Sequence, residues 1–182
     1  MHRHVMMDLE TMGTRPGSVI LSIGAVTFDP KTGDIGSAPF YATITSASCI
    51  DAGLTVDPAT RKWWKRQSIE ARAAVTRDTR PLREVAQAFR EWFRASGATF
   101  VWGQGASFDP PLWEVASRAV GIEPPWRFWN IRDTRTVYHL CDFDDKALPR
   151  EGTYHNALDD ARHQVLCVAA ALAQLRKVGE RA

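Results

Sequence analysis

Hydrophobic residues near the N-terminus fall into short runs rather than into helical spacing. The runs at 3–9, 18–28 and 39–45 contain the β-branched and aromatic residues that are typical of strands. Turn-forming residues at 29–33 separate the second run from the third. Because the connections are short, these segments predict three strands in an antiparallel meander.

After residue 56 the hydrophobic spacing becomes helical and then alternates with further strands. Asp57 and Pro58 are suited to an N-cap and first turn, and Leu82, Val85 and Phe89 fall on one helical face. We expect helices at 57–65, 68–75, 81–93, 110–119, 134–141 and 156–177, and strands at 98–102 and 127–131. The order predicts an α/β fold in one domain over 1–182: a mixed five-stranded sheet, with the antiparallel meander followed by parallel strands, flanked by helices.

Composition narrows the class of protein. Of the 182 residues 45% are hydrophobic, too many for a disordered chain, yet no apolar run is long enough to span a membrane. The N-terminal segment lacks the apolar stretch of a signal peptide, so we expect a cytoplasmic protein without a membrane partner. The net charge of +2 neither requires nor excludes a nucleic-acid partner. The three cysteines are widely spaced, which predicts buried, reduced thiols.

Two carboxylates follow the first apolar run. Asp8 and Glu10 are two residues apart, so on a strand their side chains share a face. Side-by-side carboxylates at the end of a central strand repel each other unless a cation, most simply a divalent one, lies between them. The alternative is that the strand has already ended and both residues are solvated.

Asp109 follows the fourth expected strand and precedes two prolines. Its position is that of an ordinary helix-capping residue, which is one interpretation. The other is that it joins Asp8 and Glu10 at the same edge of the sheet.

The most informative stretch is 154–161, where the last helix begins. His155 is placed in the loop entering this helix, and Asp160 lies one turn in, on an otherwise apolar face. A buried carboxylate without a partner is costly, and a metal shared with Asp8 and Glu10 would relieve that cost. Asp159 is turned away and is expected in solvent, as is His163.

Together these segments resemble the DEDDh 3′–5′ exonucleases of the ribonuclease H-like fold. The resemblance rests on three ordered motifs: Met7-Asp8-Leu9-Glu10-Thr11-Met12-Gly13, Trp102-Gly103-Gln104-Gly105-Ala106-Ser107-Phe108-Asp109, and His155-Asn156-Ala157-Leu158-Asp159-Asp160. The segments 57–67 and 132–136 resemble the branch that holds phage exonucleases and small bacterial exoribonucleases. The second motif departs from many relatives at 104–107, so polar substrate contacts there are not carried over.

The resemblance implies a catalytic site made from four acids and one imidazole. Asp8, Glu10 and Asp160 would bind one Mg²⁺ or Mn²⁺, and Asp8 would bridge to a second ion that Asp109 reaches through water. His155 would be the general base that takes a proton from the attacking water. The implied reaction removes nucleoside 5′-monophosphates from the 3′ end of RNA or DNA.

Substrate contacts follow from the same resemblance. The segment after Glu10 would line the pocket for the terminal nucleotide, Phe108 would pack on a base or sugar, and the region around Trp64 would reach the scissile end. The expected substrate-binding residues are Leu9, Thr11, Met12, Gly13, Trp64, Gln67 and Phe108. Core packing is the alternative for at least one of Trp63 and Trp64.

Two other functions remain open from the sequence. One is a non-catalytic nucleic-acid-binding module on the same fold, and the other is a ribonuclease H-type endonuclease. The sequence does not decide between RNA and DNA, or between a single strand and a duplex with an overhang. A homodimer is also an open expectation, for which Trp126 and Trp129 in a proline-rich segment are the candidate interface residues.

Overall fold

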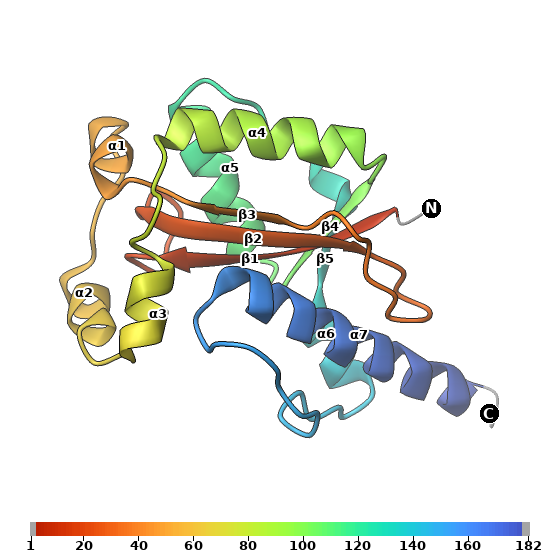
Figure 1. Cartoon of the computed structure of the whole chain (residues 1–182). Coiled ribbons are helices and arrows are strands. Elements are labelled where there is room, and N and C mark those ends of the chain that lie inside the picture. Colours follow the sequence, from red (N-terminus) through yellow and green to blue (C-terminus); the bar gives the residue numbers. More distant parts are fainter. Residues whose placement is uncertain (1–2, 180–182) are drawn as a thin grey trace.

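The computed structural model describes residues 3–179, so both ends of the predicted 1–182 domain lie outside the described residues. Figure 1 shows a central sheet between two groups of helices. The elements in chain order are β1 (His4–Thr11), β2 (Ile20–Phe28), β3 (Phe40–Thr43), α1 (Ser46–Asp51), α2 (Pro58–Trp64), α3 (Ile69–Ala74), α4 (Leu82–Ala95), β4 (Phe100–Gly103), α5 (Asp109–Ala119), the 3-10 helix η1 (Phe128–Asn130), β5 (Ile131–Asp133), α6 (Thr134–Leu140) and α7 (Ala157–Gly179).

The sheet has the strand order β3-β2-β1-β4-β5. β1, β2 and β3 form an antiparallel meander, whereas β4 pairs parallel to β1 and β5 parallel to β4. The predicted mixed five-stranded sheet is therefore confirmed. β1 lies at its centre, so residues at the end of β1 are close to the elements that follow β4 and β5.

Alternate residues of β1 point to opposite faces of the sheet. Val5 and Met7 belong to the hydrophobic core beneath α4 and α5, while Met6 belongs to the core shared with α6 and α7. Asp8 and Glu10 have the same parity as Met6, which directs both carboxylates toward α7. The expectation that these two side chains share a face is confirmed.

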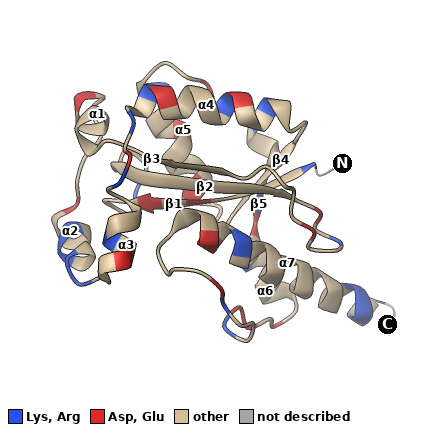
Figure 2. Ribbon diagram, viewed as in Figure 1, with Lys and Arg blue, Asp and Glu red and all other residues tan. Residues whose placement is uncertain are grey.

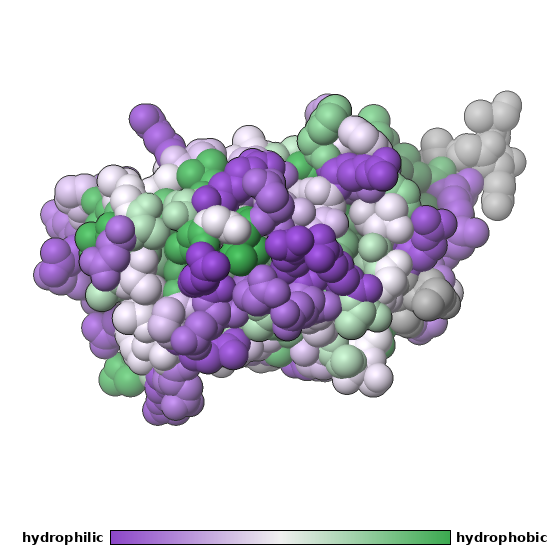
Figure 3. Space-filling view, turned by 90° about the horizontal axis from the view of Figure 1, so that it is seen from above, coloured by the Kyte–Doolittle hydropathy of each residue, from purple (hydrophilic) through white to green (hydrophobic). Residues whose placement is uncertain are grey.

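The helix α4 covers one face of the sheet. Its buried residues recur at helical spacing and pack on the strands, as the sequence predicted. Seen from above, this side of the molecule is hydrophilic over much of its surface, with smaller hydrophobic areas between (Figure 3). Among residues 3–179 no helix has both the length and the apolar character that crossing a bilayer requires.

Local structure departs from the sequence prediction in two places. The helix α1 was not expected, because its six residues carry no helical hydrophobic repeat. The predicted strand at 127–131 is instead η1 followed by β5, because Phe128 and Trp129 are exposed and only the residues from Ile131 pair with β4. The three cysteines are free and buried, as expected.

The two tryptophans considered for an interface lie in different environments. Trp126 is 8% exposed and packs against Phe89 and Phe93, so it is a core residue and unsuited to the interface role. Trp129 is 55% exposed beside Phe128. The homodimer stays a prediction.

Candidate active site

The C-terminal half of β1 supplies two acids to the face that α7 covers. Asp8 accepts a hydrogen bond of 2.7 Å from Nε2 of Gln164, and Glu10 is only 7% exposed. A shift in the pairing of β1 with β2 follows between Glu10 and Thr11 and ends the regular ladder there. Figure 2 shows acidic residues at this end of β1.

Gly24 allows α7 to approach these acids. It lies opposite Asp8 in the β1–β2 register, and a Cβ there would stand 2.2 Å from backbone atoms of Ala157 and Leu158. Because only glycine leaves this space, the first turn of α7 lies directly on the sheet. Asp160 lies in that first turn and is 9% exposed.

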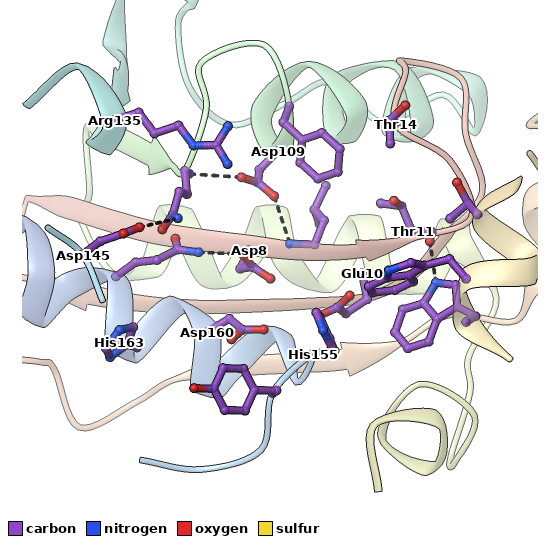
Figure 4. Close-up of a pocket in the computed structure, with 18 of the residues that line it drawn as sticks. Asp8, Glu10, Thr11, Thr14, Asp109, Arg135, Asp145, His155, Asp160 and His163 are labelled. Carbon is purple, nitrogen blue, oxygen red and sulfur yellow. Dashed lines mark hydrogen bonds between the residues drawn. The ribbon is translucent and has the colours of Figure 1, made fainter. Parts of the chain in front are cut away.

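Asn156 sets where α7 begins. Its side-chain oxygen accepts hydrogen bonds from the backbone N–H groups of Leu158 and Asp159, which is N-cap chemistry. The preceding residue, His155, has φ of 61°, a left-handed conformation that is uncommon outside glycine. The cap and this turn together direct the imidazole back over the carboxylates (Figure 4).

Asp109 reaches the same cleft from the start of α5. Its two carboxylate oxygens accept hydrogen bonds from the backbone N–H groups of Leu9 and Gln104, at 3.1 and 3.2 Å, and the residue is 2% exposed. Gly103 lies against this carboxylate, and a Cβ there would be 2.9 Å from Oδ2. Asp109 therefore joins the second motif to the first rather than only capping its own helix.

Glu10, His155 and Asp160 form a compact group of candidate metal ligands. One ligand atom from each lies within 4.8 Å of the others. Two carboxylates and an imidazole converging from β1, the loop before α7 and α7 itself are arranged as for a shared cation. Asp8 and Asp109 add further carboxylate oxygens to the same cleft.

Burial and mutual repulsion make these acids hard to ionise. Burial raises the pKa of Glu10 to about 8 and that of Asp109 to about 7, and the charge of Asp109 adds to the effect on Glu10. The pKa of Asp8 is raised well above its usual range by burial and by both neighbouring acids. A divalent cation would remove this penalty by favouring the charged forms.

The pKa of His155 is shifted in the opposite direction. Partial burial and the nearby charge of Arg150 lower its pKa below 6.5. The imidazole is therefore neutral at pH 7, which leaves a ring nitrogen free to accept a proton. The ring of Trp63 meets it edge to face, with 4.8 Å between the ring centroids.

The loop of residues 141–156, which joins α6 to α7, closes one side of the cleft. Arg150 forms an ion pair with Asp160 and lies 4.2 Å above the ring of Tyr154. Asp145 accepts a hydrogen bond of 3.1 Å from the side chain of Gln104, which fastens the loop to the second motif. These contacts hold the loop beside the carboxylates, and the hydrogen bond to Asp145 is drawn in Figure 4.

The cleft has a volume of about 950 Å³, which is within the range of small-molecule and cofactor sites. Four of the residues predicted to bind substrate, Leu9, Thr11, Trp64 and Phe108, line it. Trp64 is 4% exposed and donates a hydrogen bond of 2.8 Å to the carbonyl of Thr11, so it is also a core residue. The other three expected residues, Met12, Gly13 and Gln67, are not among the lining residues.

Two expectations about α7 were wrong. His163 is half-buried and lines the cleft instead of facing solvent. Asp159 is also half-buried: it accepts a hydrogen bond from the backbone N–H of Thr153 and lies 3.7 Å from Arg162. The 141–156 loop binds Asp159, and His163 contacts Cys167 one turn along α7, neither of which helical spacing alone reveals.

Sequence reasoning gave no role to several other residues of the cleft, among them Asp145, Arg150 and Gln164. Gln164 follows Asp160 by four residues and therefore shares its helical face, a signal that was available. Arg135 lies within the segment 132–136 that the resemblance singled out, but its place beside the cleft followed only from the pairing of β5 with β4. Asp145 and Arg150 lie in an irregular loop, where no periodicity indicates direction.

The sheet, the acidic end of β1 and the histidine before α7 define a ribonuclease H-like exonuclease. Residues 3–172 match the model of the family described as the 3′-5′ exoribonuclease Rv2179c-like domain. The chain belongs to this family, and it is accordingly a 3′–5′ exonuclease with a nucleic-acid substrate.

Individual known nucleases also resemble this chain, at sequence identities of 25% or less. An exodeoxyribonuclease of Enterobacteria phage T4 is 25% identical over 203 residues, covering 92% of this chain and 88% of that protein. E. coli exonuclease I, solved with a dT13 oligonucleotide, shares the fold with a TM-score of 0.69 and 14% identity. The match covers 98% of this chain but only 42% of exonuclease I.

A second solved structure matches over nearly its whole length. The nuclease domain of 3′hExo, a DEDDh family member bound to rAMP, superimposes with a TM-score of 0.60 and 12% identity over 93% of this chain and 91% of that domain. The DEDDh resemblance drawn from the three motifs is thereby confirmed at the level of the fold.

Proposed function

We propose that this chain hydrolyses the terminal phosphodiester bond at the 3′ end of RNA or DNA and releases nucleoside 5′-monophosphates. The observation that carries the proposal is the convergence of Glu10, Asp160 and His155, with ligand atoms within 4.8 Å of one another. Asp109, which is buried, and Asp8, which is half-buried, extend this group with further carboxylate oxygens.

The donor set fits hard divalent cations. Asp8, Glu10, Asp109 and Asp160 would hold Mg²⁺ or Mn²⁺, since carboxylate oxygens are the ligands those ions prefer. A zinc-bound form of E. coli exonuclease I with single-stranded DNA has been solved, and it supports a metal-dependent reaction here. When bound, two such ions would activate the attacking water and would stabilise the negative charge that develops on the leaving 3′-oxygen.

The chain's own residues supply the proton transfer and the placement of the substrate. His155 acts as the general base, because its lowered pKa keeps the imidazole neutral and it stands beside the acidic group. Phe108 and the half-exposed Trp63 offer aromatic surfaces for the terminal bases, and Thr11 contributes to the wall of the cleft at the end of β1.

Digestion of 5′-labelled oligonucleotides tests the proposal. Matched RNA and DNA strands are incubated with Mg²⁺ or Mn²⁺, and a ladder that shortens stepwise from the 3′ end is expected. The Asp8→Asn variant, shown to be folded by circular dichroism, should give no ladder. The same two substrates show whether this chain prefers RNA or DNA. The family is one of exoribonucleases, whereas the phage T4 relative is an exodeoxyribonuclease.

The remaining alternatives predict different products. A binding module would retain both oligonucleotides and release no nucleotide, and Asp8→Asn would bind like the parent. An endonuclease of the ribonuclease H type would open a circular substrate, which has no 3′ end. Either result would contradict the proposed function.

A further inference from the structure

Arg150 occupies an unusual position for a cation. It comes from the irregular 141–156 loop, yet its side chain is only 17% exposed and forms an ion pair with Asp160, whose side chain is 13% exposed. Its guanidinium also lies 4.2 Å above the ring of Tyr154. A cation desolvated to this degree needs a negative partner, and that partner is a proposed metal ligand.

The charge of Arg150 acts on three of the four acids, whereas Asp109 has Arg135 as its cationic neighbour. Arg150 is an electrostatic partner of Asp8, Glu10 and His155 as well as of Asp160. One positive charge therefore faces carboxylates that outnumber it. A divalent ion placed among the same oxygens would supply twice that charge from a more compact group.

Both cations would draw on the same carboxylate. Asp160 is a member of the compact trio with Glu10 and His155, and it is also the carboxylate that Arg150 holds. We propose that Arg150 competes with the divalent cation for Asp160 and must leave this carboxylate when the ion binds. This inference rests on the proposed function, because it takes Asp160 to be a metal ligand.

The competition links metal binding to the loop. Arg150 and His155 are five residues apart in the 141–156 loop, and Tyr154, the ring beneath the guanidinium, is next to His155. Departure of Arg150 from Asp160 releases one of the contacts that hold this end of the loop against α7, the other being the hydrogen bond from Thr153 to Asp159. Metal binding and the position of the proposed general base are coupled through one ion pair.

The test measures Mn²⁺ affinity by isothermal titration calorimetry without substrate. Arg150→Met removes the competing charge but keeps an apolar side chain, and we expect it to bind Mn²⁺ about tenfold more tightly or better. Arg150→Lys keeps the positive charge but lacks the planar guanidinium, so its Mn²⁺ affinity should lie between those of the parent and of Arg150→Met. In thermal denaturation with EDTA, Arg150→Met should have a lower Tm than the parent and a larger gain in Tm on adding Mn²⁺.

Two matched control variants distinguish competition for Asp160 from a general electrostatic effect of positive charge near the cleft. Lys146→Met removes one positive charge from the same loop and cleft, at an exposed side chain. Arg162→Met removes an arginine that pairs with Asp159 instead of Asp160. Both should change Mn²⁺ affinity much less than Arg150→Met does.

Three results would overturn the inference. The first is an unchanged Mn²⁺ affinity in Arg150→Met. The second is a weaker Mn²⁺ affinity in Arg150→Met, which would make Arg150 a residue that positions Asp160 for the ion. The third is a gain in Mn²⁺ affinity in Lys146→Met equal to that in Arg150→Met. In all three the parent binds Mn²⁺ and the proposed function survives. A parent protein that binds no Mn²⁺ would overturn the metal site and this inference together.

Discussion

Asp109 accepts a hydrogen bond from the backbone N–H of Leu9, the residue between Asp8 and Glu10. The parallel pairing of β1 with β4 ends at Met6, so this N–H lies beyond the last strand partner on that side. A side chain from α5 thus takes the place of a strand. The same contact fixes the distance between the second motif and the two acids of the first.

Substitution of Asp109 separates its structural role from its charge. Asp109→Ala leaves the N–H groups of Leu9 and Gln104 without their acceptor, whereas Asp109→Asn keeps one carbonyl oxygen. We expect the alanine variant to be less stable than the asparagine variant by about 1–3 kcal/mol in urea denaturation. Both variants should lose about 10- to 100-fold in nuclease activity. Equal stability of the two would mean that the hydrogen bonds to Asp109 contribute little.

The stability of the ion-free protein should fall as the pH rises from 6.5 to 8. The pKa values of Glu10 and Asp109 are raised to about 8 and about 7 in the folded chain, so the folded state holds protons that the unfolded state has already released. Their stabilising effect is complete below the unfolded pKa, near 4, and is lost as the pH passes through the folded values. His4 and His155, whose folded pKa values are lowered, act oppositely only below about pH 6.5.

Thermal denaturation in EDTA checks this dependence. The Tm should be lower at pH 8 than at pH 6.5 by more than about 2–4 °C, the change that corresponds to 1 kcal/mol in a chain of this size. Saturating Mn²⁺ should reduce the difference, because the ion favours the ionised acids. Glu10→Gln should flatten the dependence in EDTA, and a parent Tm that rises over this range would contradict the raised pKa values.

His155 should contribute to the rate and little to metal affinity. If it is the general base, His155→Ala lowers kcat by about 10²- to 10⁴-fold while Mn²⁺ affinity changes by less than about threefold. Its ring also lies close enough to Glu10 and Asp160 to be a ligand. Calorimetry with Mn²⁺ distinguishes the two roles, because a ligand's removal would weaken binding along with the rate.

Gly24→Ala should disturb the metal site from β2, the strand on which the start of α7 lies. The new Cβ would meet the backbone of Ala157 and Leu158 at 2.2 Å, so the start of α7 must move away from β2. We expect a loss of about 1–3 kcal/mol in the free energy of unfolding. Because Asp160 lies in that turn, Mn²⁺ affinity should also fall, by about 10- to 100-fold.

Gly53→Ala is the control for this substitution. Gly53 has φ of 87° but no atom within 4 Å of an added Cβ. Its replacement is strained by backbone conformation alone, at a cost of about 1–2 kcal/mol. Stability should fall while Mn²⁺ affinity stays at the parent value, and an equal loss of affinity in both variants would point to global unfolding.

Local regularities made most of the fold predictable. The alternation along 3–9, the cap at Asp57 and the helical spacing after Leu82 each depend on neighbours in the chain, so the elements and the mixed sheet followed from them. The first strand also placed Asp8 and Glu10 on one face without reference to any other segment. Where the hydrophobic repeat is short or absent, as in α1 and η1, the prediction failed.

The sequence by itself determined which acids and which histidine are available, and the order of the elements that carry them. Only the tertiary structure decided that α7 lies on β2 at Gly24, that Asp109 binds the backbone of β1, and that Arg150 pairs with Asp160. The first two contacts join residues 133 and 100 positions apart, and the third comes from an irregular loop. Periodicity reports the face of an element, whereas the partner of that face is set by packing, which no local pattern encodes.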